Sequence, residues 1–392
     1  MTDQPTLNAH WNYPTRVRVG AGAAAELAQL CAQHGLTAPL LVTDPGLVDL
    51  PMTRSLIDQL QGHLQPGVFS EIKSNPGGDN VEAGARAFRE GKHDGVIALG
   101  GGSALDAGKA IALLAGQAGT LFDYADEEGA APIDGAAIAP VIALPTTAGT
   151  GSEVGRASVI TDTAQERKRI IFHPNMLPVQ VILDPELTVG LPAHITAATG
   201  MDALSHNLEA LCATAYHPMA AGIALEGIKL VKIFLPRAVS DGTDLEARTN
   251  MLVASSMGAT AFQRGLGAMH ALSHPLGALY DAHHGLLNAI VMPYVLVANM
   301  PAIETVLADA ARALDLPIHS ASGFVDWVLE MREQLGIPHT LAEIGIDDAL
   351  AERIGIMAAT DSTAPGNPIL FSEKQYSALL QNAIAGELSP IS

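Results

Sequence analysis

Short apolar runs and longer helical patterns alternate along the first half of the chain. The apolar runs are rich in Val, Ile and Leu, are bounded by Gly, Pro or polar residues, and lie at 39–44, 68–72, 95–100, 140–145 and 180–184. Intervening segments, such as 21–34 and 103–115, repeat apolar residues at helical spacing. Strands that alternate with helices are typical of a parallel sheet covered by helices on both faces. We therefore expect an α/β domain over residues 1–190.

The pattern changes after about Leu191. Apolar residues then recur at helical spacing over 196–214, 219–234 and 245–262, and again from 267 toward the end, while strand-like runs almost disappear. Two prolines and a glycine within 184–192 punctuate this change. We expect a second, all-α domain over residues 191–392, in which 362–368 forms a loop before the last helix.

Composition narrows the classes of function. At 392 residues the chain exceeds the size at which one hydrophobic core keeps growing, so two domains are expected. The formal net charge of −20 argues against binding to nucleic acid, which depends on clustered Lys and Arg, and against anionic membranes for the same reason. An acidic surface is a common solubility feature and identifies no partner by itself.

The cysteines and the N-terminal sequence bear on location. Cys31 and Cys212 are the only cysteines, too few for a disulfide framework or a thiolate zinc site. The first residues lack a basic region followed by an apolar stretch, and no uninterrupted apolar run reaches the roughly 20 residues that span a bilayer. We expect a soluble, cytoplasmic protein without a membrane association.

A glycine-rich turn follows the strand-like run at 95–100. Gly101 and Gly102 lead into Ser103, which is expected to open a helix as its N-cap or to donate to a phosphate. A helix N-terminus offers unpaired N–H groups, and glycines let the chain approach a ligand closely, so the turn suits a pyrophosphate. The segment matches neither the P-loop nor the pattern Gly-x-Gly-x-x-Gly, and a simple tight turn stays an alternative.

A second polar loop, at 144–153, follows another strand-like run. Its hydroxyl donors, interleaved with glycines, are Thr146, Thr147, Thr150 and Ser152. Two such loops at neighbouring strand ends indicate one ligand at the carboxyl edge of a Rossmann-like sheet. The alternative is a loop that satisfies its own backbone by local hydrogen bonds.

Asp44 closes an earlier strand-like run. A carboxylate at such a strand end can accept hydrogen bonds from ribose hydroxyls and repel a 2′-phosphate, which favours NAD over NADP. The alternative is that Asp44, followed by Pro45 and Gly46, only starts a turn.

Histidines fall at helical spacing in the second half of the chain. Asp202 and His206 are four residues apart, as are His270 and His274, so the members of each pair project from one face of a helix. A pair of adjacent histidines follows at 283–284. A carboxylate with imidazoles suits a divalent metal such as Fe(II) or Zn(II), since no thiolate is available. One pair alone is more often structural, but three successive segments predict a metal site, because burying imidazoles without partners is costly.

Together these segments resemble the iron-containing (group III) alcohol dehydrogenase family over nearly the whole chain. The resemblance is carried by the glycine turn with Asp106 and Lys109, by the loop at 144–153 followed by 159–162, by 200–206, by 270–285 and by the Asn-Pro pair at 367–368. It implies a Rossmann-like α/β domain followed by an all-α domain, the dehydroquinate synthase-like architecture. It also implies a metal-dependent, NAD-linked enzyme that interconverts a small primary alcohol or diol and its aldehyde by hydride transfer.

The same resemblance assigns site residues. The metal ligands correspond to Asp202, His206, His270 and His284, the last because the family's ligand directly precedes a glycine; His283 is its adjacent competitor. His274 corresponds to an additional active-site histidine that relays a proton or orients the substrate. The positions that hold NAD correspond to Asp44, Asn75, Gly101, Gly102, Ser103, Thr146, Thr147, Thr150, Val159 and Lys168. Fe(II) is the expected metal, with Zn(II) and Ni(II) as alternatives.

Departures from the family pattern lie where the substrate is chosen. Ala157, after the second loop, and Phe262 and Leu266, from a helical segment, are expected to face one cavity whose Ala-rich lining suits a small, mainly apolar alcohol. The resemblance further implies a homo-oligomer, either a dimer or a multiple of dimers.

Other functions on the same fold are less favoured. A dehydroquinate-synthase-like lyase is expected to use Glu and two His at its metal and several basic side chains in its pocket, whereas the ligand segment here begins with Asp202 and is poor in Lys and Arg. A non-catalytic nucleotide-binding protein, or a metal-free relative such as maleylacetate reductase, is disfavoured because all four ligand positions are intact.

Overall fold

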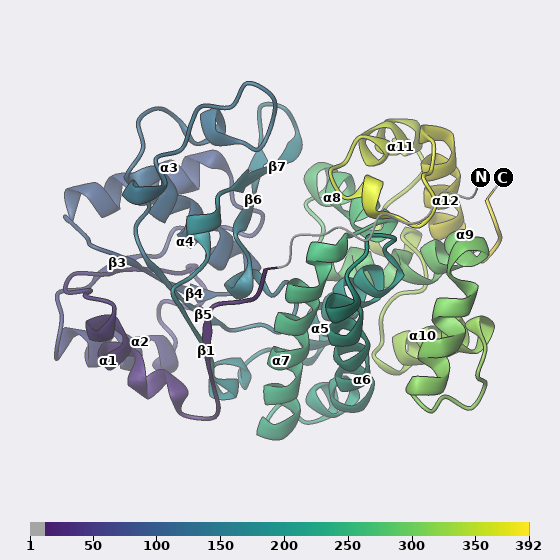
Figure 1. Ribbon diagram of the computed structural model, residues 1–392, viewed down its shortest axis with the longest axis horizontal. Coiled ribbons are helices and arrows are strands. Elements are labelled where there is room, and N and C mark those ends of the chain that lie inside the picture. The colour runs from purple at the N-terminus through teal and green to yellow at the C-terminus, as the bar shows by residue number, and fades with distance from the viewer. Residues whose placement is uncertain (1–11, 392) are drawn as a thin grey trace. The chain divides into compact units, whose positions relative to one another are not determined.

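The structure is a computed structural model that describes residues 12–391 (Figure 1). The described residues form two compact units. The first, called here the α/β unit, contains Tyr13–Leu191 and Thr243–Ser256. The second, called the helical unit, contains Asn12, Pro192–Gly242 and residues 257–391. The chain therefore leaves the α/β unit after Leu191 and returns to it for a short segment.

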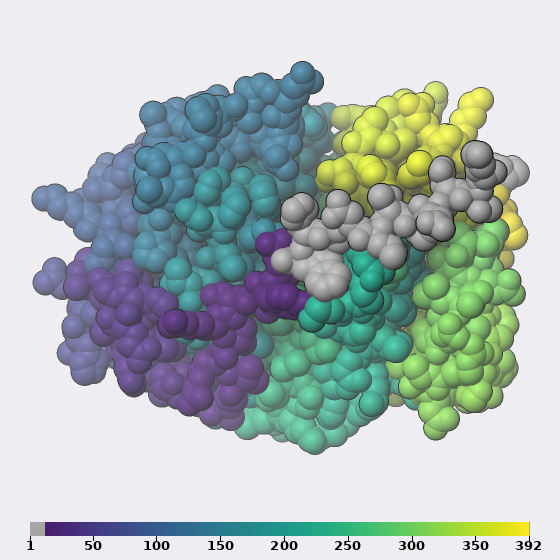
Figure 2. Space-filling model, viewed as in Figure 1, coloured from purple at the N-terminus to yellow at the C-terminus, as the bar shows by residue number. Residues whose placement is uncertain are grey.

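A six-stranded parallel sheet forms the centre of the α/β unit. In spatial order its strands are β1 (Arg16–Val19), β8 (Gln180–Leu183), β5 (Val141–Pro145), β4 (Val96–Gly100), β2 (Leu40–Val42) and β3 (Gly67–Phe69). The expected parallel α/β fold is thereby confirmed, with β1 as an unexpected edge strand. All four residues of β1 are exposed, and the N-terminal part of this unit, purple in Figure 2, lies at its surface.

Alternate residues of the sheet face opposite layers of helices. The helices are α1 (Leu27–Gln33), α2 (Pro51–Gln61), α3 (Gly78–Glu90) and α4 (Gly102–Ala115). In β4, Val96 and Ala98 belong to the core that contains α3 and α4. Ile97 and Leu99 belong to the core that contains α1 and α2. This two-residue period gives the sheet an apolar layer on each face, and Figure 1 shows the two helix pairs on opposite sides of it.

The order of the strands reverses between β2 and β4. The chain runs from β2 outward to β3, returns to β4 on the other side of β2, and continues to β5. Ligands of open parallel sheets bind outside the carboxyl ends of the strands at such a switch point. Asp44, Gly101 and Thr146 follow these ends of β2, β4 and β5.

A separate two-stranded antiparallel hairpin completes the α/β unit. It consists of β6 (Ala157–Asp162) and β7 (Arg167–Phe172), with Val159 opposite Ile170 and Thr161 opposite Lys168. Neither strand was expected from the apolar pattern. Strand β6 alternates partly buried and buried residues, and only one residue of β7 is buried, so the hairpin lacks the continuous apolar run that marks the central strands.

The helical unit has no strand among its described residues, which confirms the expected all-α second part. Its helices are α5 (Ala193–Cys212), α6 (Pro218–Ser240), α8 (Ala268–Tyr280), α9 (His284–Ala313), α10 (Ala321–Gln334), α11 (Ala351–Ala359) and α12 (Glu373–Ala385). Helix α7 (Leu245–Ala261) contributes its residues up to Ser256 to the α/β unit and the rest to the helical unit. Within the helical unit, α5 packs against both α6 and α9.

Helix α9 is long and apolar enough to span a bilayer by those two measures. Its most apolar 18-residue window has a mean hydropathy of 1.7, but 72% of that window is buried inside the protein. A buried core helix of a large domain can be equally long and apolar, because it too is surrounded by apolar groups. The burial therefore identifies α9 as a core helix of this unit.

Both cysteines are expected to be chemically inert in the folded protein. Cys31 is buried and Cys212 is half-buried, and their loss of hydration raises the pKa of each thiol to about 12. Because the thiolate is the reactive form, alkylation by iodoacetamide at about pH 8 should be about a thousandfold slower than for a free thiol. Intact-mass spectrometry should show no label on the native chain and two after unfolding. Rapid labelling of the native chain would contradict this burial.

Candidate functional site

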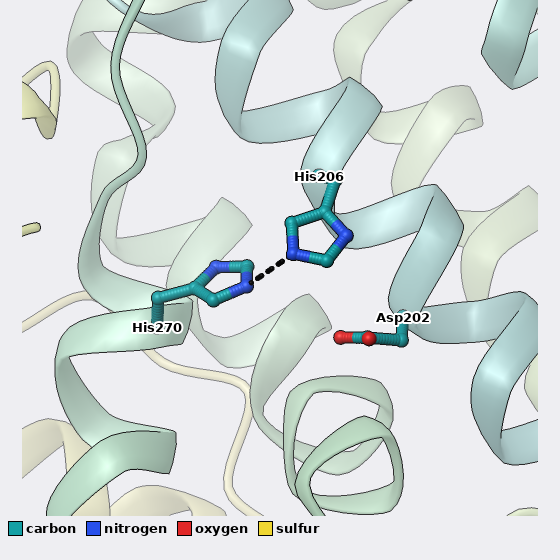
Figure 3. A group of neighbouring side chains, drawn as sticks. All are labelled: Asp202, His206 and His270. Atoms are coloured by element: carbon teal, nitrogen blue, oxygen red, sulfur yellow. Dashed lines mark hydrogen bonds between the residues drawn. The ribbon is translucent and has the colours of Figure 1, made fainter. Parts of the chain in front are cut away.

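Three side chains of the helical unit converge in its interior. Asp202 and His206 project from α5 one turn apart, and His270 lies in the first turn of α8. One potential ligand atom of each lies within 4.8 Å of the other two, and all three residues are buried. Figure 3 shows the three side chains arranged around a common centre. The structure thus places together three of the four residues that the sequence suggested as metal ligands.

The spacing of these atoms fits a small divalent cation. Nε2 of His206 lies 2.9 Å from Nε2 of His270, and the two rings stack with centroids 4.6 Å apart. Ligands placed about 2.1 Å from a tetrahedral metal lie about 3.4 Å from one another. The two nitrogens lie somewhat closer than that, and the remaining separations stay within 4.8 Å. One carboxylate with imidazoles is also a donor set that Fe(II), Zn(II) and Ni(II) accept.

His284 begins α9 beside this cluster. Its Nε2 lies 3.8 Å from Oδ1 of Asp202, and its ring centroid lies 5.3 Å from that of His270. Gly285 allows this approach, because a Cβ there would stand only 2.6 Å from the backbone oxygen of Ala198 on α5. His284 is therefore positioned to complete the cluster, and its role as fourth ligand stays a prediction.

The adjacent His283 has a different environment. Its side chain is exposed, and Nδ1 accepts a hydrogen bond from the backbone N–H of Leu286 in the first turn of α9. It is the N-cap of that helix. Of the two adjacent histidines, only His284 lies within reach of Asp202.

Asn288, one turn beyond His284 on α9, points into the cluster and was missed by the sequence reasoning. Its Nδ2 donates to Oδ1 of Asp202 at 2.8 Å and lies 3.2 Å from Nε2 of His270 and 3.3 Å from Nε2 of His284. Its Oδ1 is buried and has no hydrogen-bond partner among the described residues. The spacing of four residues after His284 is the one sequence signal that pointed to it.

A carboxylate orients His274. Nδ1 of His274 lies 2.9 Å from Oδ2 of Asp361, and Thr363 donates to Oδ1 of Asp361 from its N–H at 2.8 Å and its hydroxyl at 2.6 Å. Burial by itself raises the pKa of Asp361, but His274 and these hydrogen bonds outweigh it and lower the pKa. When Nδ1 carries the proton shared with Asp361, Nε2 is the nitrogen that can exchange a proton.

The three suggested substrate-pocket residues lie in different parts of the chain. The ring of Phe262, in the short 3₁₀ helix Phe262–Arg264, lies 5.4 Å from that of His206. Leu266 lies between that 3₁₀ helix and α8, whereas Ala157 begins β6 in the α/β unit. Phe262 thus borders the histidine cluster, and a pocket shared by all three residues stays a prediction.

In the α/β unit, the N-cap of helix α4 lies two residues before the expected position. Its N-cap is Gly101, which has no side chain to cap the helix, and Gly102 is its first residue. The prediction that Ser103 is the N-cap was therefore wrong, because the backbone is already helical before it. Ser103 lies in the first turn instead, where its hydroxyl remains a predicted phosphate donor.

The two polar loops pack against each other at the switch point. A Cβ at Gly102 would stand 2.6 Å from Cγ2 of Thr150, and one at Gly101 would stand 3.3 Å from Oγ1 of Thr147. The N–H of Thr146 donates to the backbone oxygen of Gly100 at 3.0 Å. The glycines are thus required for loop contact, in addition to any ligand they approach.

Asp44 uses its two oxygens differently. Oδ1 accepts the backbone N–H groups of Gly46 at 2.8 Å and Leu47 at 3.0 Å, so the residue does start a turn. Oδ2 lies 3.6 Å from the point where a Cβ would stand at Gly100, at the end of β4. The turn and a contact to a ligand at this strand end are therefore compatible.

The hairpin contributes the remaining suggested cofactor residues. Nζ of Lys168 donates to Oδ1 of Asn75 at 2.9 Å, and the N–H of Val159 donates to Oδ2 of Asp106 on α4 at 2.9 Å. Asn75 has a left-handed backbone conformation with φ of 49°. These contacts join Lys168 of the hairpin to Asn75 and Val159 to α4, and a role of these three residues in cofactor binding stays a prediction.

A buried charge network joins α4 to the second loop. Nζ of Lys109 is fully buried, lies 3.2 Å from Oδ1 of Asp106, and donates to the backbone oxygens of Ser152, at 2.9 Å, and Ala157. Asp106 also accepts from the Ser152 hydroxyl and the Val159 N–H. Burial lowers the pKa of Lys109, and Asp106 opposes that shift. The network fixes the loop, the helix and the hairpin against one another.

Comparisons with known proteins cover almost the whole chain. The profile of the family "Iron-containing alcohol dehydrogenase" matches residues 14–185, and that of "Fe-containing alcohol dehydrogenase family, C-terminal" matches residues 196–384. A 4-hydroxybutyrate dehydrogenase from Cupriavidus necator is 41% identical over 380 residues, which cover 95% of this chain and 99% of that protein.

Two further proteins are similar to this chain over nearly its whole length. An NAD-dependent methanol dehydrogenase from Bacillus methanolicus is 33% identical over 93% of this chain and 97% of its own length. The crystal structure of a 1,3-propanediol oxidoreductase superposes with a TM-score of 0.91 at 33% identity, covering 96% of this chain and 100% of that one. The similarity therefore includes both units and their order along the chain.

Proposed function

Because the chain belongs to the iron-containing alcohol dehydrogenase family, we propose that it is a metal-dependent, NAD-linked alcohol dehydrogenase. It interconverts a small primary alcohol or diol and its aldehyde by hydride transfer. The observation that carries the proposal is the buried convergence of Asp202, His206 and His270. The similarity to dehydrogenases of 4-hydroxybutyrate and methanol supports the reaction class.

Asp202, His206, His270 and His284 would hold the metal, with Fe(II) the first candidate and Zn(II) or Ni(II) as alternatives. A divalent cation supplies a Lewis acid for an alcohol or carbonyl oxygen when bound. The chain's own contribution is a buried carboxylate and imidazoles already directed at one point, so little reorganisation is needed. Asn288 keeps Oδ1 of Asp202 in place through its 2.8 Å hydrogen bond.

The strand ends of the α/β unit would hold NAD, which accepts or returns the hydride. The N-terminus of α4 and its glycines would face the pyrophosphate, and Ser103, Thr146, Thr147 and Thr150 would be hydroxyl donors to it. Asp44 would bind the ribose, while Asn75, Val159 and Lys168 would border the cofactor from the loop and the hairpin. Two loops already packed together by Gly101 and Gly102 support this arrangement.

His274 would move the proton that the alcohol hydroxyl loses. Its Nδ1 is held by Asp361, so Nε2 accepts the proton and passes it on. Ala157, Phe262 and Leu266 would border the substrate and limit its size. We assign nucleotide binding to residues 1–190 and metal binding with catalysis to residues 191–392.

We further propose a cytoplasmic homodimer, or a multiple of dimers, that acts on small molecules and not on nucleic acid or membranes. Strand β1 is an edge strand that is exposed among residues 12–391, and this supports self-association because exposed edge strands tend to pair. The relatives support a dehydrogenase over the dehydroquinate-synthase-like lyase or a non-catalytic nucleotide-binding protein.

The test is turnover by anaerobically purified protein loaded with Fe(II) or Zn(II). NADH absorbance is followed with C2 to C4 alcohols and aldehydes, including 4-hydroxybutyrate and 1,3-propanediol. We expect turnover that a chelator removes and metal restores, and the same activity in His319→Ala, which changes an exposed histidine of the same unit. Binding of NAD without turnover of any alcohol or aldehyde in any metal form would favour the lyase or the non-catalytic alternative.

Cofactor choice is expected to depend on the charge of Asp44. Asp44→Ser keeps an oxygen for the turn and removes the carboxylate that repels a 2′-phosphate. We expect the ratio of kcat/KM for NADP to that for NAD to rise by about ten- to a hundredfold, since a charge pair near a surface contributes a few kcal/mol. Asp49→Ser, at an exposed position ion-paired with Arg54, is the control. An unchanged ratio would mean that Asp44 only starts the turn and does not select the cofactor.

A further inference from the structure

We infer that Glu209 is a positioning residue of the metal centre: its carboxylate fixes both the start of α8 and the ring of His270, so that Nε2 of His270 faces Asp202 and His206. This inference rests on the proposed metal centre. It concerns a residue outside the expected ligand set, one that acts on the metal only through His270.

Glu209 belongs to the same stripe of α5 as two proposed ligands. Asp202, His206 and Glu209 are separated by four and then three residues, so they project from one face of the helix, and all three are buried. The helix therefore carries two ligands and, one turn further along, the carboxylate that meets α8. This spacing is visible in the sequence and places Glu209 on the same helix face as the two proposed ligands.

The carboxylate caps α8 from outside that helix. Oε2 accepts the N–H of Gly267 at 2.8 Å, and Oε1 accepts the N–H of Met269 at 2.7 Å. Gly267 is the N-cap and has no side chain with which to satisfy these donors. A negative charge at a helix N-terminus also interacts favourably with the helix dipole. Glu209 thus fixes the backbone from which His270 projects.

The same carboxylate sets the orientation of the His270 ring. Oε2 lies 2.6 Å from Nδ1 of His270, so Nδ1 carries a hydrogen, and in the neutral ring Nε2 then keeps its lone pair for a metal. Nε2 is the atom that lies 2.9 Å from Nε2 of His206. A carboxylate behind a histidine in this way fixes the tautomer and raises the basicity of the ligand nitrogen.

A carboxylate is required because three donors share its two oxygens. The N–H groups of Gly267 and Met269 and the Nδ1–H of His270 all point at Glu209. A glutamine keeps the size but offers one oxygen and two further hydrogens, so at least one buried donor faces another donor. The loss of one buried acceptor oxygen therefore weakens both the N-terminus of α8 and the orientation of the His270 ring.

The first test compares metal affinity in chelator competition. Glu209→Gln should bind Zn(II) about ten- to a hundredfold more weakly than wild type, the usual effect of removing a carboxylate behind a histidine ligand. Glu226→Gln, at an exposed position of α6, is the matched control and should bind as wild type does. Unchanged affinity in Glu209→Gln would overturn the inference.

A double-mutant cycle separates ring orientation from general structure. In His270→Ala the ring is gone, so adding Glu209→Gln should change the residual metal affinity by less than about twofold. An equally large loss in both backgrounds would mean that Glu209 acts on the fold and not through His270, and would overturn the inference.

The tautomer can be read in metal-free protein, by ¹⁵N NMR of histidine-labelled wild type at a pH at which the ¹⁵N shifts of His270 are those of a neutral ring. The His270 signals, identified by their loss in His270→Ala, should show hydrogen on Nδ1. Hydrogen on Nε2 would overturn the inference, even if Glu209→Gln does not fold. Hydrogen on Nδ1 in a wild type that binds no metal would instead contradict the proposed function and leave the orienting role supported.

Discussion

His270→Ala is expected to weaken metal binding so far that the purified variant no longer carries one metal ion per subunit, and to lower kcat/KM for alcohol oxidation by about a thousandfold or more. The change removes a proposed ligand from a buried cluster and leaves the carboxylate of Glu209 without the Nδ1 donor at 2.6 Å. A Lewis acid contributes several kcal/mol to stabilising developing charge. Loss of about four kcal/mol corresponds to a thousandfold in rate. Metal per subunit and steady-state rates measure the two effects.

The controls for this variant distinguish the site from the fold. His319→Ala changes an exposed histidine of the same unit and should keep both metal content and rate. NAD affinity, measured by fluorescence titration, should be unchanged in His270→Ala, since its expected site lies in the α/β unit. Wild-type metal content in His270→Ala would show that the ion binds elsewhere and would contradict the proposed centre.

Lys109→Met is expected to lower the free energy of unfolding of the α/β unit by about 3–5 kcal/mol, the usual effect of removing one partner of a buried ion pair. The ammonium group is fully buried, and its loss leaves Asp106 without its cation and the carbonyl of Ser152 without its donor. Urea unfolding followed by circular dichroism measures the change. Because the network holds the second loop, NAD affinity should fall as well.

The exposed Lys229→Met provides the comparison for this stability effect. Lys229 lies 3.8 Å from Glu226 on the surface of α6, and removal of such a pair should change stability by less than about 1 kcal/mol. An equally small effect for Lys109→Met would mean that the buried lysine contributes no more than a surface charge. It would contradict the assignment of Lys109 as the centre of the network.

The elements that could be predicted from sequence are those whose burial produces a clear pattern of apolar residues. The central strands are buried on both faces and therefore read as continuous apolar runs, as in β4 and β5. Strand β1 alternates Arg and Val, is exposed along its whole length, and depends on β8 for its conformation. The hairpin β6–β7 was missed because only four of its twelve residues are buried and it shows no continuous apolar run.

Local spacing likewise decided which site residues could be found. Asp202 and His206 are four residues apart on α5, so the sequence alone brings them onto one helix face. Asp361, the partner of His274, lies 87 residues further along the chain, and no local pattern connects the two. The N-cap of α4 was misplaced by two residues, because glycines adopt both extended and helical backbone and do not mark where a helix starts.

The return of the chain to the α/β unit has a consequence for its synthesis. Residues 13–191 leave the ribosome first, but this unit also includes Thr243–Ser256, where the hydroxyl of Ser256 donates to the buried Glu153 at 2.6 Å. Helices α5 and α6 of the other unit are made before that segment. The α/β unit therefore reaches its full set of contacts only after part of the helical unit has been translated, and the two units mature in an interleaved order rather than one after the other.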